Sequence, residues 1–291
     1  MKDALDEKWF RGIAYLLLAA TALSCLLPML HIISLSLSDQ QSVVSGRVAF
    51  WPQGWSMESY RMLFHGTRIL PAFANSLVIT FGGILLSMVF TIFAAYPLSR
   101  KTMYARRTFT LIIVFTMIFN GGMIPTFLVV KALGLLDSYG AIWFPSLVSA
   151  FNMLIMKNYF EQIPEEMEEA AKIDGCGEWR FLTQILLRVS LPVIAMVTLF
   201  YAILYWNSFF VVLIYIQDTE KYNLAVLVQQ MLQSQSVLQE MNNLRPEDQM
   251  ATTPEGIRSA GIMVMVIPML LVYPFLQKYF IKGIMIGAIK G

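Results

Sequence analysis

The residues best suited to chemistry in this sequence lie in one charged stretch between two long apolar blocks. Pro164 opens it, and four glutamates follow within five residues: Glu165, Glu166, Glu168 and Glu169. Proline is favoured in the first turn of a helix, and carboxylates near a helix N-terminus are stabilised by the helix dipole. The pattern therefore predicts a short helix over residues 164–173. Gly175 predicts a left-handed residue that ends this helix.

This short helix carries a surface suited to another protein. The three- and four-residue spacing predicts a shared face with two alanines that permit close approach, formed by Met167, Ala170, Ala171 and Asp174. A helix held by lipid usually carries basic residues on its polar face, whereas this one is acidic. The sequence therefore favours a protein partner, with an ordinary interfacial amphipathic helix as the alternative.

A second group of polar residues lies within apolar blocks. Aromatic rings and amides can stack on a polar solute and hydrogen-bond to it. If the protein carries such a solute across a membrane, the candidates for its translocation path are Asn120, Asn152, Tyr201, Tyr205, Trp206 and Asn207. Tyr201 and Tyr205 are four residues apart, so they share one helical face. Packing between helices is the alternative role for each of these side chains.

The composition indicates which elements hold these residues. Of 291 residues, 57% are hydrophobic and 14% charged, whereas an average soluble domain has about 25% charged residues. Uncharged stretches are each long enough to cross the hydrocarbon core of a bilayer, about 30 Å thick. We expect an all-α membrane protein with six transmembrane helices, at about residues 12–38, 72–99, 108–130, 138–156, 189–217 and 259–277. They form one membrane domain, 12–277, flanked by segments 1–11 and 278–291, with the short helix in the loop 157–188 between the fourth and fifth spans.

The basic residues predict how this domain is oriented. Six spans place both termini on one side of the membrane. If that side is the cytoplasm, inside segments hold fourteen lysines and arginines and outside segments hold seven. Positive charge is enriched on the cytoplasmic side. We therefore expect a multi-pass protein of a bacterial-type plasma membrane with cytoplasmic termini and a cytoplasmic loop 157–188.

Several kinds of chemistry are excluded by what the sequence lacks. It contains no GxxxxGK[ST] phosphate loop, no HExxH motif and no cluster of cysteine and histidine. The predicted spans hold no charged side chain, although ion-coupled carriers commonly place carboxylates there. We therefore expect neither an enzyme nor a metal or cofactor in this chain, and its mild net charge of +2 predicts no nucleic-acid partner.

The loop resembles the signature of the membrane subunits of binding-protein-dependent ABC importers, in which Glu-Ala-Ala precedes a glycine and a hydrophobic residue. The matching residues, with Glu168 preceding them, are Glu169, Ala170, Ala171, Asp174, Gly175 and Ile185. Where the family usually has Leu-Pro, this chain has Leu187-Arg188, and Pro192 matches a second proline of many members. Three further strings resemble the carbohydrate branch, maltose-type permeases for complex oligosaccharides: residues 119–125, 133–138 and 205–210.

This resemblance implies partners and a mechanism. The loop would be a coupling helix that docks on one of two ATP-hydrolysing subunits, which bind ATP and magnesium. A second homologous permease and an extracellular solute-binding protein would complete the importer, and the carbohydrate would cross between the permeases. The resemblance names no sugar, and it leaves open whether segment 218–258 touches the binding protein. A stand-alone secondary carrier or facilitator, or a membrane protein that moves no solute, is the alternative.

Overall fold

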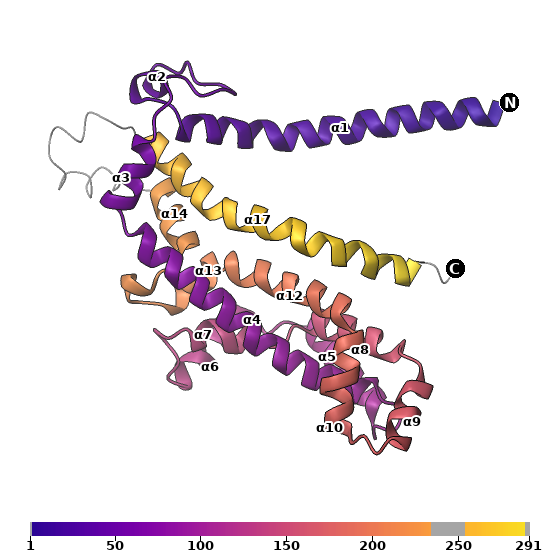
Figure 1. The fold of residues 1–291 in the computed structure, drawn as a ribbon. Helices are drawn as coiled ribbons and strands as arrows, with labels where there is room; N and C mark the ends of the chain where they lie inside the picture. Colours follow the sequence, from indigo (N-terminus) through magenta and orange to yellow (C-terminus); the bar gives the residue numbers. More distant parts are fainter. Residues whose placement is uncertain (1, 234–253, 289–291) are drawn as a thin grey trace. The chain divides into compact units, whose positions relative to one another are not determined.

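The protein is built from helices joined by turns, and the part of the chain that is described contains no β-strand. The structure is a computed structural model that describes residues 2–233 and 254–288 (Figure 1). The chain divides into two compact units. The first takes Met1–Leu70 and Val228–Pro268, and the second takes Pro71–Leu227 and Met269–Gly291.

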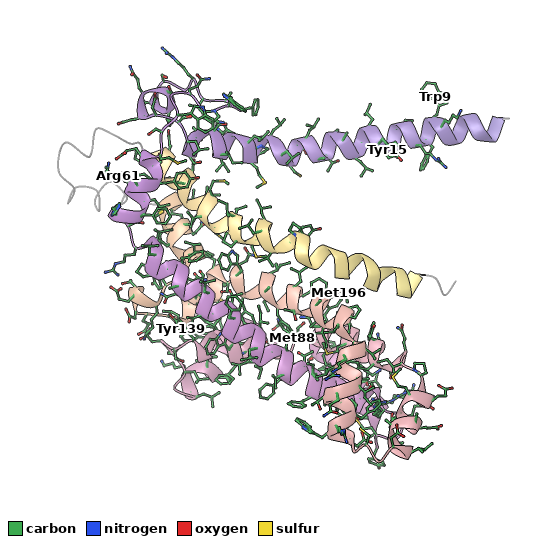
Figure 2. The ribbon with its side chains drawn as sticks, viewed as in Figure 1. Trp9, Tyr15, Arg61, Met88, Tyr139 and Met196 are labelled. Carbon is green, nitrogen blue, oxygen red and sulfur yellow. The ribbon has the colours of Figure 1, made fainter. Side chains whose placement is uncertain are left out.

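The first unit contains two long apolar helices and two short ones. Its helices are α1 Lys2–Ser36, α2 Gln40–Val44, α3 Glu58–Gly66 and the first part of α17 Pro254–Ala288. From Lys8 to Leu30 most side chains of α1 are exposed, as Trp9 and Tyr15 illustrate (Figure 2), whereas Ser34 and Ser36 near its end are buried. α3 packs against α17 at Gly261. A Cβ built on this glycine would lie 3.9 Å from Leu63 of α3 and 3.5 Å from the sulfur of Met231.

The second unit is organised around one long helix, α4 Ile69–Ser99. The other helices of this unit are α5 Arg106–Ile118, α6 Met123–Ala132, α7 Gly140–Trp143, α8 Ala150–Glu161, α9 Glu165–Ile173, α10 Glu178–Arg180, α11 Leu187–Val189, α12 Leu191–Trp206 and α13 Phe209–Tyr215. Short 3-10 turns cover Phe144–Ser146 and Thr219–Lys221, and a π-helical turn covers Phe181–Leu186. Helix α14, Leu224–Gln233, begins in this unit and ends in the first.

Glycines of α4 allow neighbouring helices to approach closely. A Cβ on Gly82 would lie 2.7 Å from the ring of Trp143, and a Cβ on Gly83 would lie 2.6 Å from the ring of Tyr205. The indole nitrogen of Trp143 donates to the carbonyl oxygen of Ile79 at 3.0 Å. α4 is therefore packed against α7 and α12 at distances that side chains larger than glycine would prevent.

Three helices are long and apolar enough to cross a membrane, in Lys8–Ser36, Ile69–Ser99 and Pro254–Pro274 of the described chain. Three pairs reach this length only when counted across a bend: Arg106–Ile118 with Met123–Ala132 at 112°, Gly140–Ser146 with Ala150–Glu161 at 51°, and Glu178–Val189 with Leu191–Trp206 at 82°. Six spans result if each bent pair is one span. The expected ranges 108–130, 138–156 and 189–217 are therefore interrupted, and none of them is one straight helix.

The bend before α12 lies where the sequence departs from the family pattern. α11 ends at Val189, and Ser190 precedes α12, whose second residue is Pro192. Proline fits the first turn of a helix because it lacks the N–H that the first turn leaves without an intrahelical partner. Arg188 is exposed in the last turn of α11. The chain therefore turns at Ser190, next to the second proline position, without a proline at residue 188.

Candidate docking site around helix α9

Local sequence signals determine both ends of α9. Pro164 is the N-cap, and three glutamates occupy the first turn. At the other end Gly175 has φ +74°, its N–H donates to the carbonyl oxygen of Lys172 at 3.0 Å, and the N–H of Cys176 donates to that of Ala171 at 2.8 Å. These two bonds form a Schellman motif. The predicted helix and its left-handed terminating glycine are both present.

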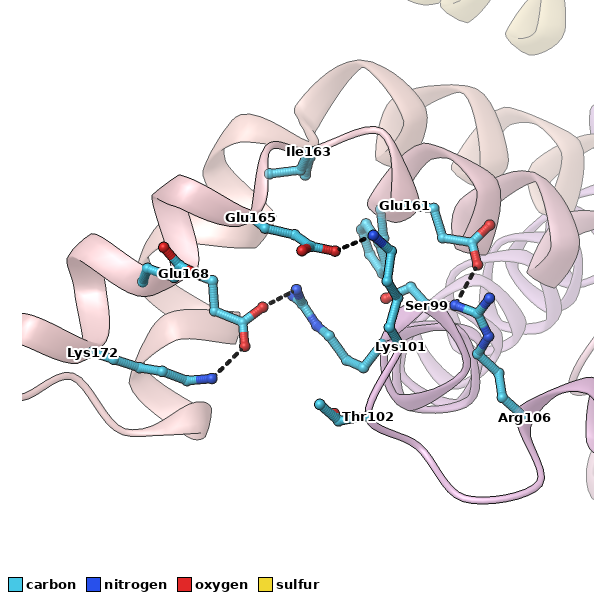
Figure 3. A pocket seen from close by; sticks show the side chains of 12 residues that line it. Ser99, Lys101, Thr102, Arg106, Glu161, Ile163, Glu165, Glu168 and Lys172 are labelled. Carbon is cyan, nitrogen blue, oxygen red and sulfur yellow. Dashed lines mark hydrogen bonds and ion pairs between the residues drawn. The ribbon is translucent and has the colours of Figure 1, made fainter.

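One face of α9 is held by the connection between α4 and α5 (Figure 3). Lys101 lies 2.6 Å from a carboxylate oxygen of Glu165. Arg100 pairs with Glu168, which also accepts a hydrogen bond of 2.7 Å from Lys172. Hydrogen bonding to Lys101 lowers the pKa of Glu165, and hydrogen bonding to Glu168 raises the pKa of Lys172. Two of the four glutamates are therefore neutralised within this chain.

The adjacent face of α9 is open to a partner, and Glu169 lies at its edge towards the ion-paired face. Residues spaced as neighbours on one helix face are all exposed: Glu166, Glu169, Ala170 and Ile173. Ile173 is 87% exposed, which is unusual for an isoleucine. We call these four residues the outward face of α9. It combines two carboxylates with an apolar end.

The face expected to hold both alanines is divided. Ala171 is 6% exposed and packs into the apolar core, whereas Ala170 is exposed on the outward face. The prediction of one flat surface with two adjacent alanines was wrong, because consecutive residues on a helix point about 100° apart. Glu169, Asp174 and Gly175 remain exposed around Ala170.

A cavity of about 360 Å³ lies between α9 and the segment that follows α4 (Figure 3). Its charged lining includes four basic and four acidic side chains: Arg100, Lys101, Arg106, Lys172, Glu161, Glu165, Glu168 and Glu169. Arg106 lies 3.2 Å and Lys157 lies 2.8 Å from the same carboxylate oxygen of Glu161. The charges balance, so the cavity is part of the support of α9 and has no excess charge for an ionic ligand.

Two of the path candidates, Tyr201 and Tyr205, lie inside the second unit. Tyr201 is 0% and Tyr205 1% exposed. The Tyr201 hydroxyl is 2.7 Å from the Thr91 hydroxyl, and the Tyr205 hydroxyl is 2.7 Å from the Ser87 hydroxyl. Their shared face therefore meets α4, where these tyrosines pack helices together.

The other four path candidates divide between the interior and the surface. Asn152 and Trp206 are each 4% exposed, and the Trp206 ring contacts the Phe73 ring edge-on. Asn120 and Asn207 are exposed. Asn120 accepts a hydrogen bond of 2.9 Å from the backbone N–H of Gly122, in the break between α5 and α6. Asn207 lies in the break between α12 and α13, and its side chain donates to the carbonyl oxygen of Ile203 at 2.9 Å.

A polar cluster far from α9 was not predicted. Asp137, at φ +59°, accepts backbone hydrogen bonds from Gln217 and Asp218, and Lys221 lies 2.8 Å from its carboxylate. These contacts lower the pKa of Asp137 to about 2, chiefly through the Lys221 hydrogen bond. Asn75, near the start of α4, donates to the carbonyl oxygens of residues 220 and 222. In the sequence, the Asp137-Ser138 pair after an apolar run indicates a turn at this position.

We expect Asp137→Asn to lower the melting temperature of the protein at neutral pH, because the carboxylate holds Lys221 and two backbone N–H groups. The folded-state pKa of about 2 lies below the ordinary 3.8. The contribution of the charge is therefore fully present above pH 3.8 and is lost as the pH falls towards 2. Thermal unfolding followed by tryptophan fluorescence should show the difference between wild type and variant shrinking over that interval. A difference that is constant with pH would contradict this assignment.

The sequence is similar to known membrane transport proteins. Residues 87–286 match the family described as binding-protein-dependent transport system inner membrane component. The polygalacturonan/rhamnogalacturonan transport system permease protein YtcP of Bacillus subtilis (strain 168) is 40% identical over 291 residues, 99% of this chain and 100% of that one. Protein LplC of the same organism is 40% identical over 268 residues, 91% of this chain and 90% of that one.

A solved structure shows the same fold. A chain from the crystal structure of a bacterial ABC transporter involved in the import of the acidic polysaccharide alginate aligns with a TM-score of 0.86 and 32% identity. The alignment covers 94% of this chain and 98% of that one. Because the family match covers more than half of the sequence and the relatives align along nearly its whole length, this chain belongs to the inner membrane components of binding-protein-dependent transport systems.

Proposed function

We propose that this chain is the permease subunit of an ATP-driven importer whose substrate is an acidic oligosaccharide. The observation that carries the proposal is the outward face of α9, which is exposed on a helix whose adjacent face is tied by ion pairs to the end of α4. A surface helix anchored on one side and open on the other is suited to receive a separate subunit. The family membership indicates the kind of machine.

The partners follow from the family and from the residues. ATP and magnesium are bound by two ATP-hydrolysing subunits, one of which docks on the outward face of α9. This places α9 and both termini in the cytoplasm, in agreement with the distribution of lysine and arginine. A second, homologous permease completes the path through the membrane. A solute-binding protein delivers the oligosaccharide on the outer side, as the family description implies.

Acidity of the substrate is proposed from two relatives. YtcP is named for polygalacturonan and rhamnogalacturonan, and the solved transporter imports alginate, an acidic polysaccharide. Polygalacturonan is a chain of galacturonic acid, so the relatives share carboxylated sugars. Both align along nearly the whole chain. An oligosaccharide of uronic acids is therefore the substrate class that we assign.

The break between α5 and α6 is the part of the described chain that we place on the path. The 13 residues of α5, at 1.5 Å each, put the break about 20 Å from Arg106, within the thickness of the hydrocarbon core. Irregular backbone at that depth is tolerated only where it faces protein or water. Asn120, Gly121 and Gly122 are all exposed there, so this break faces the second permease or the aqueous path rather than lipid.

The test is uptake by the whole complex, purified through a tag on this chain and reconstituted in proteoliposomes with its binding protein. A labelled galacturonic acid oligomer should accumulate only with hydrolysable ATP. Unlabelled oligomer should compete, and a neutral glucose oligomer of the same length should not. Accumulation without ATP would show a stand-alone carrier, and competition by the neutral oligomer alone would contradict the acidic substrate.

A further inference from the structure

Arg100 stands out among the basic residues near α9 because its charge is largely buried. It is the first residue after α4, and its side chain is 17% exposed. Its guanidinium lies 4.6 Å from the ring centroid of Tyr96 and 5.2 Å from that of Phe181. Tyr96 belongs to the last turns of α4, whereas Phe181 begins the π-helical turn after α10. The guanidinium therefore joins two segments that lie on either side of α9 in the sequence.

The charge of Arg100 is balanced by one carboxylate, that of Glu168 on α9. Nη1 makes this ion pair, while Nε and Nη2 are buried without a hydrogen-bond partner in the described part of the chain. Glu168 is itself 18% exposed. Removing Glu168 would leave this buried guanidinium without an opposite charge, which is far more costly than losing a surface pair. The ion pair between Arg100 and Glu168 is therefore costly to break.

The neighbouring ion pair offers a contrast. Lys101 and Glu165 have 76% and 63% exposed side chains, and ion pairs exposed to this degree contribute about 0–1 kcal/mol. Both pairs join the end of α4 to α9, one residue apart on the α4 side. Their different burial means that α9 is held by Arg100 far more firmly than by Lys101.

A second bond ties the segment after α9 to the same turn of α4. The hydroxyl of Tyr96 donates to the carboxylate of Glu178, the first residue of α10. Tyr96 and Arg100 are four residues apart, so they lie on one side of the end of α4. The end of α4 therefore holds both sides of the turn at Gly175, and α4 in turn packs on Tyr201 and Tyr205 of α12.

We propose that Arg100 is the positioning residue that transmits the movement of α9 to α4 during transport. This rests on the proposed function, in which an ATP-hydrolysing subunit moves α9. A displacement of α9 pulls on Glu168, and Arg100 passes the displacement to α4 because its guanidinium is clamped between Tyr96 and Phe181. α4 carries it to α12 through the close contacts at Gly83, Ser87 and Thr91. Without Arg100, the subunit can still dock and hydrolyse ATP, but the spans follow its motion poorly.

The experiment measures uptake and ATP hydrolysis together in proteoliposomes that contain the whole complex and the loaded binding protein. We expect Arg100→Gln to reduce uptake at least tenfold while ATP hydrolysis stays within about twofold of wild type. The number of sugars imported per ATP then falls. Arg100→Lys keeps the charge and loses the flat stacked guanidinium. Its ratio of sugar uptake to ATP hydrolysis should therefore lie between those of wild type and Arg100→Gln. A merely structural defect would lower both activities in parallel and leave the ratio unchanged.

Lys101→Gln is the matched control, since it removes the exposed pair one residue away, and it should keep the wild-type ratio. In the double variant Arg100→Glu with Glu168→Arg, the ion pair is rebuilt in reverse and the ratio should recover in part. The proposal is overturned if Arg100→Gln or Arg100→Lys lowers uptake and hydrolysis equally, or if Lys101→Gln lowers the ratio as strongly. Failure of the proposed function is a different result, in which wild type itself shows no ATP-dependent uptake.

Discussion

Glu169→Lys should reduce ATP-driven uptake at least tenfold while the protein still inserts in the membrane at normal levels. Glu169 is on the outward face of α9, where its carboxylate is exposed. Reversing a charge at a docked interface places like charges together, which costs several kcal/mol. Both uptake and binding-protein-stimulated ATP hydrolysis should fall, and the ATP-hydrolysing subunit should be lost on purification. Membrane insertion should survive because the substitution lies on a surface helix outside the predicted spans.

The matched control is a pair of neutralising substitutions one helical turn apart, at Glu169, which is exposed, and at Glu165, which pairs with Lys101. Glu169→Gln should weaken binding of the ATP-hydrolysing subunit, whereas Glu165→Gln removes only the exposed pair with Lys101 and should leave binding unchanged. Binding is measured as the amount of ATP-hydrolysing subunit recovered with tagged permease at increasing salt. Equal loss in both variants, or in neither, would show that the outward face is not the docking surface.

Gly175→Val should reduce uptake at least tenfold by changing the backbone conformation of the turn after α9. Gly175 has φ +74°, and no atom of the described residues lies within 4 Å of a Cβ built there, so a side chain meets no clash and the effect comes from the backbone alone. A left-handed conformation costs an ordinary L-residue about 1–2 kcal/mol, and a β-branched residue suffers more. The turn should relax and rotate α9 relative to α10. Uptake by proteoliposomes should then fall at least tenfold.

Two substitutions separate this backbone effect from a general sensitivity of the loop. Gly175→Asn should retain substantial uptake, because asparagine tolerates the left-handed region. Gly177→Ala, two residues along the chain, should behave as wild type, since Gly177 has φ −73° and open space for a Cβ. Loss of uptake in Gly177→Ala, or wild-type uptake in Gly175→Val, would show that the left-handed turn is not required.

Local signals allowed the sequence to predict α9 closely. Pro164, the acidic first turn and Gly175 act within a few residues of one another, so the helix and its Schellman end can be predicted without knowing the rest of the fold. The direction of its faces could not be predicted in this way. Arg100 pairs with Glu168 across 68 positions of sequence, and only the packing of the chain brings them together.

The path candidates show the same limit inside the spans. Spacing correctly placed Tyr201 and Tyr205 on one face, but burial of that face against Ser87 and Thr91 depends on where α12 meets α4. The breaks within the spans cannot be predicted from the absence of charge. Asn120, Gly121 and Gly122 are uncharged, so the uncharged stretch continues across the 112° bend. The two adjacent glycines were the available signal.

A crosslink from the outward face of α9 tests most directly whether an ATP-hydrolysing subunit docks there. Ala170→Cys is introduced into a chain whose Cys25 and Cys176 have been replaced by serine, and the purified complex is treated with a short bifunctional thiol reagent. We expect a covalent product between this chain and an ATP-hydrolysing subunit, in a complex that still imports sugar. Reaction of Ala170→Cys with a membrane-impermeant reagent added outside intact cells, with no such product, would contradict it.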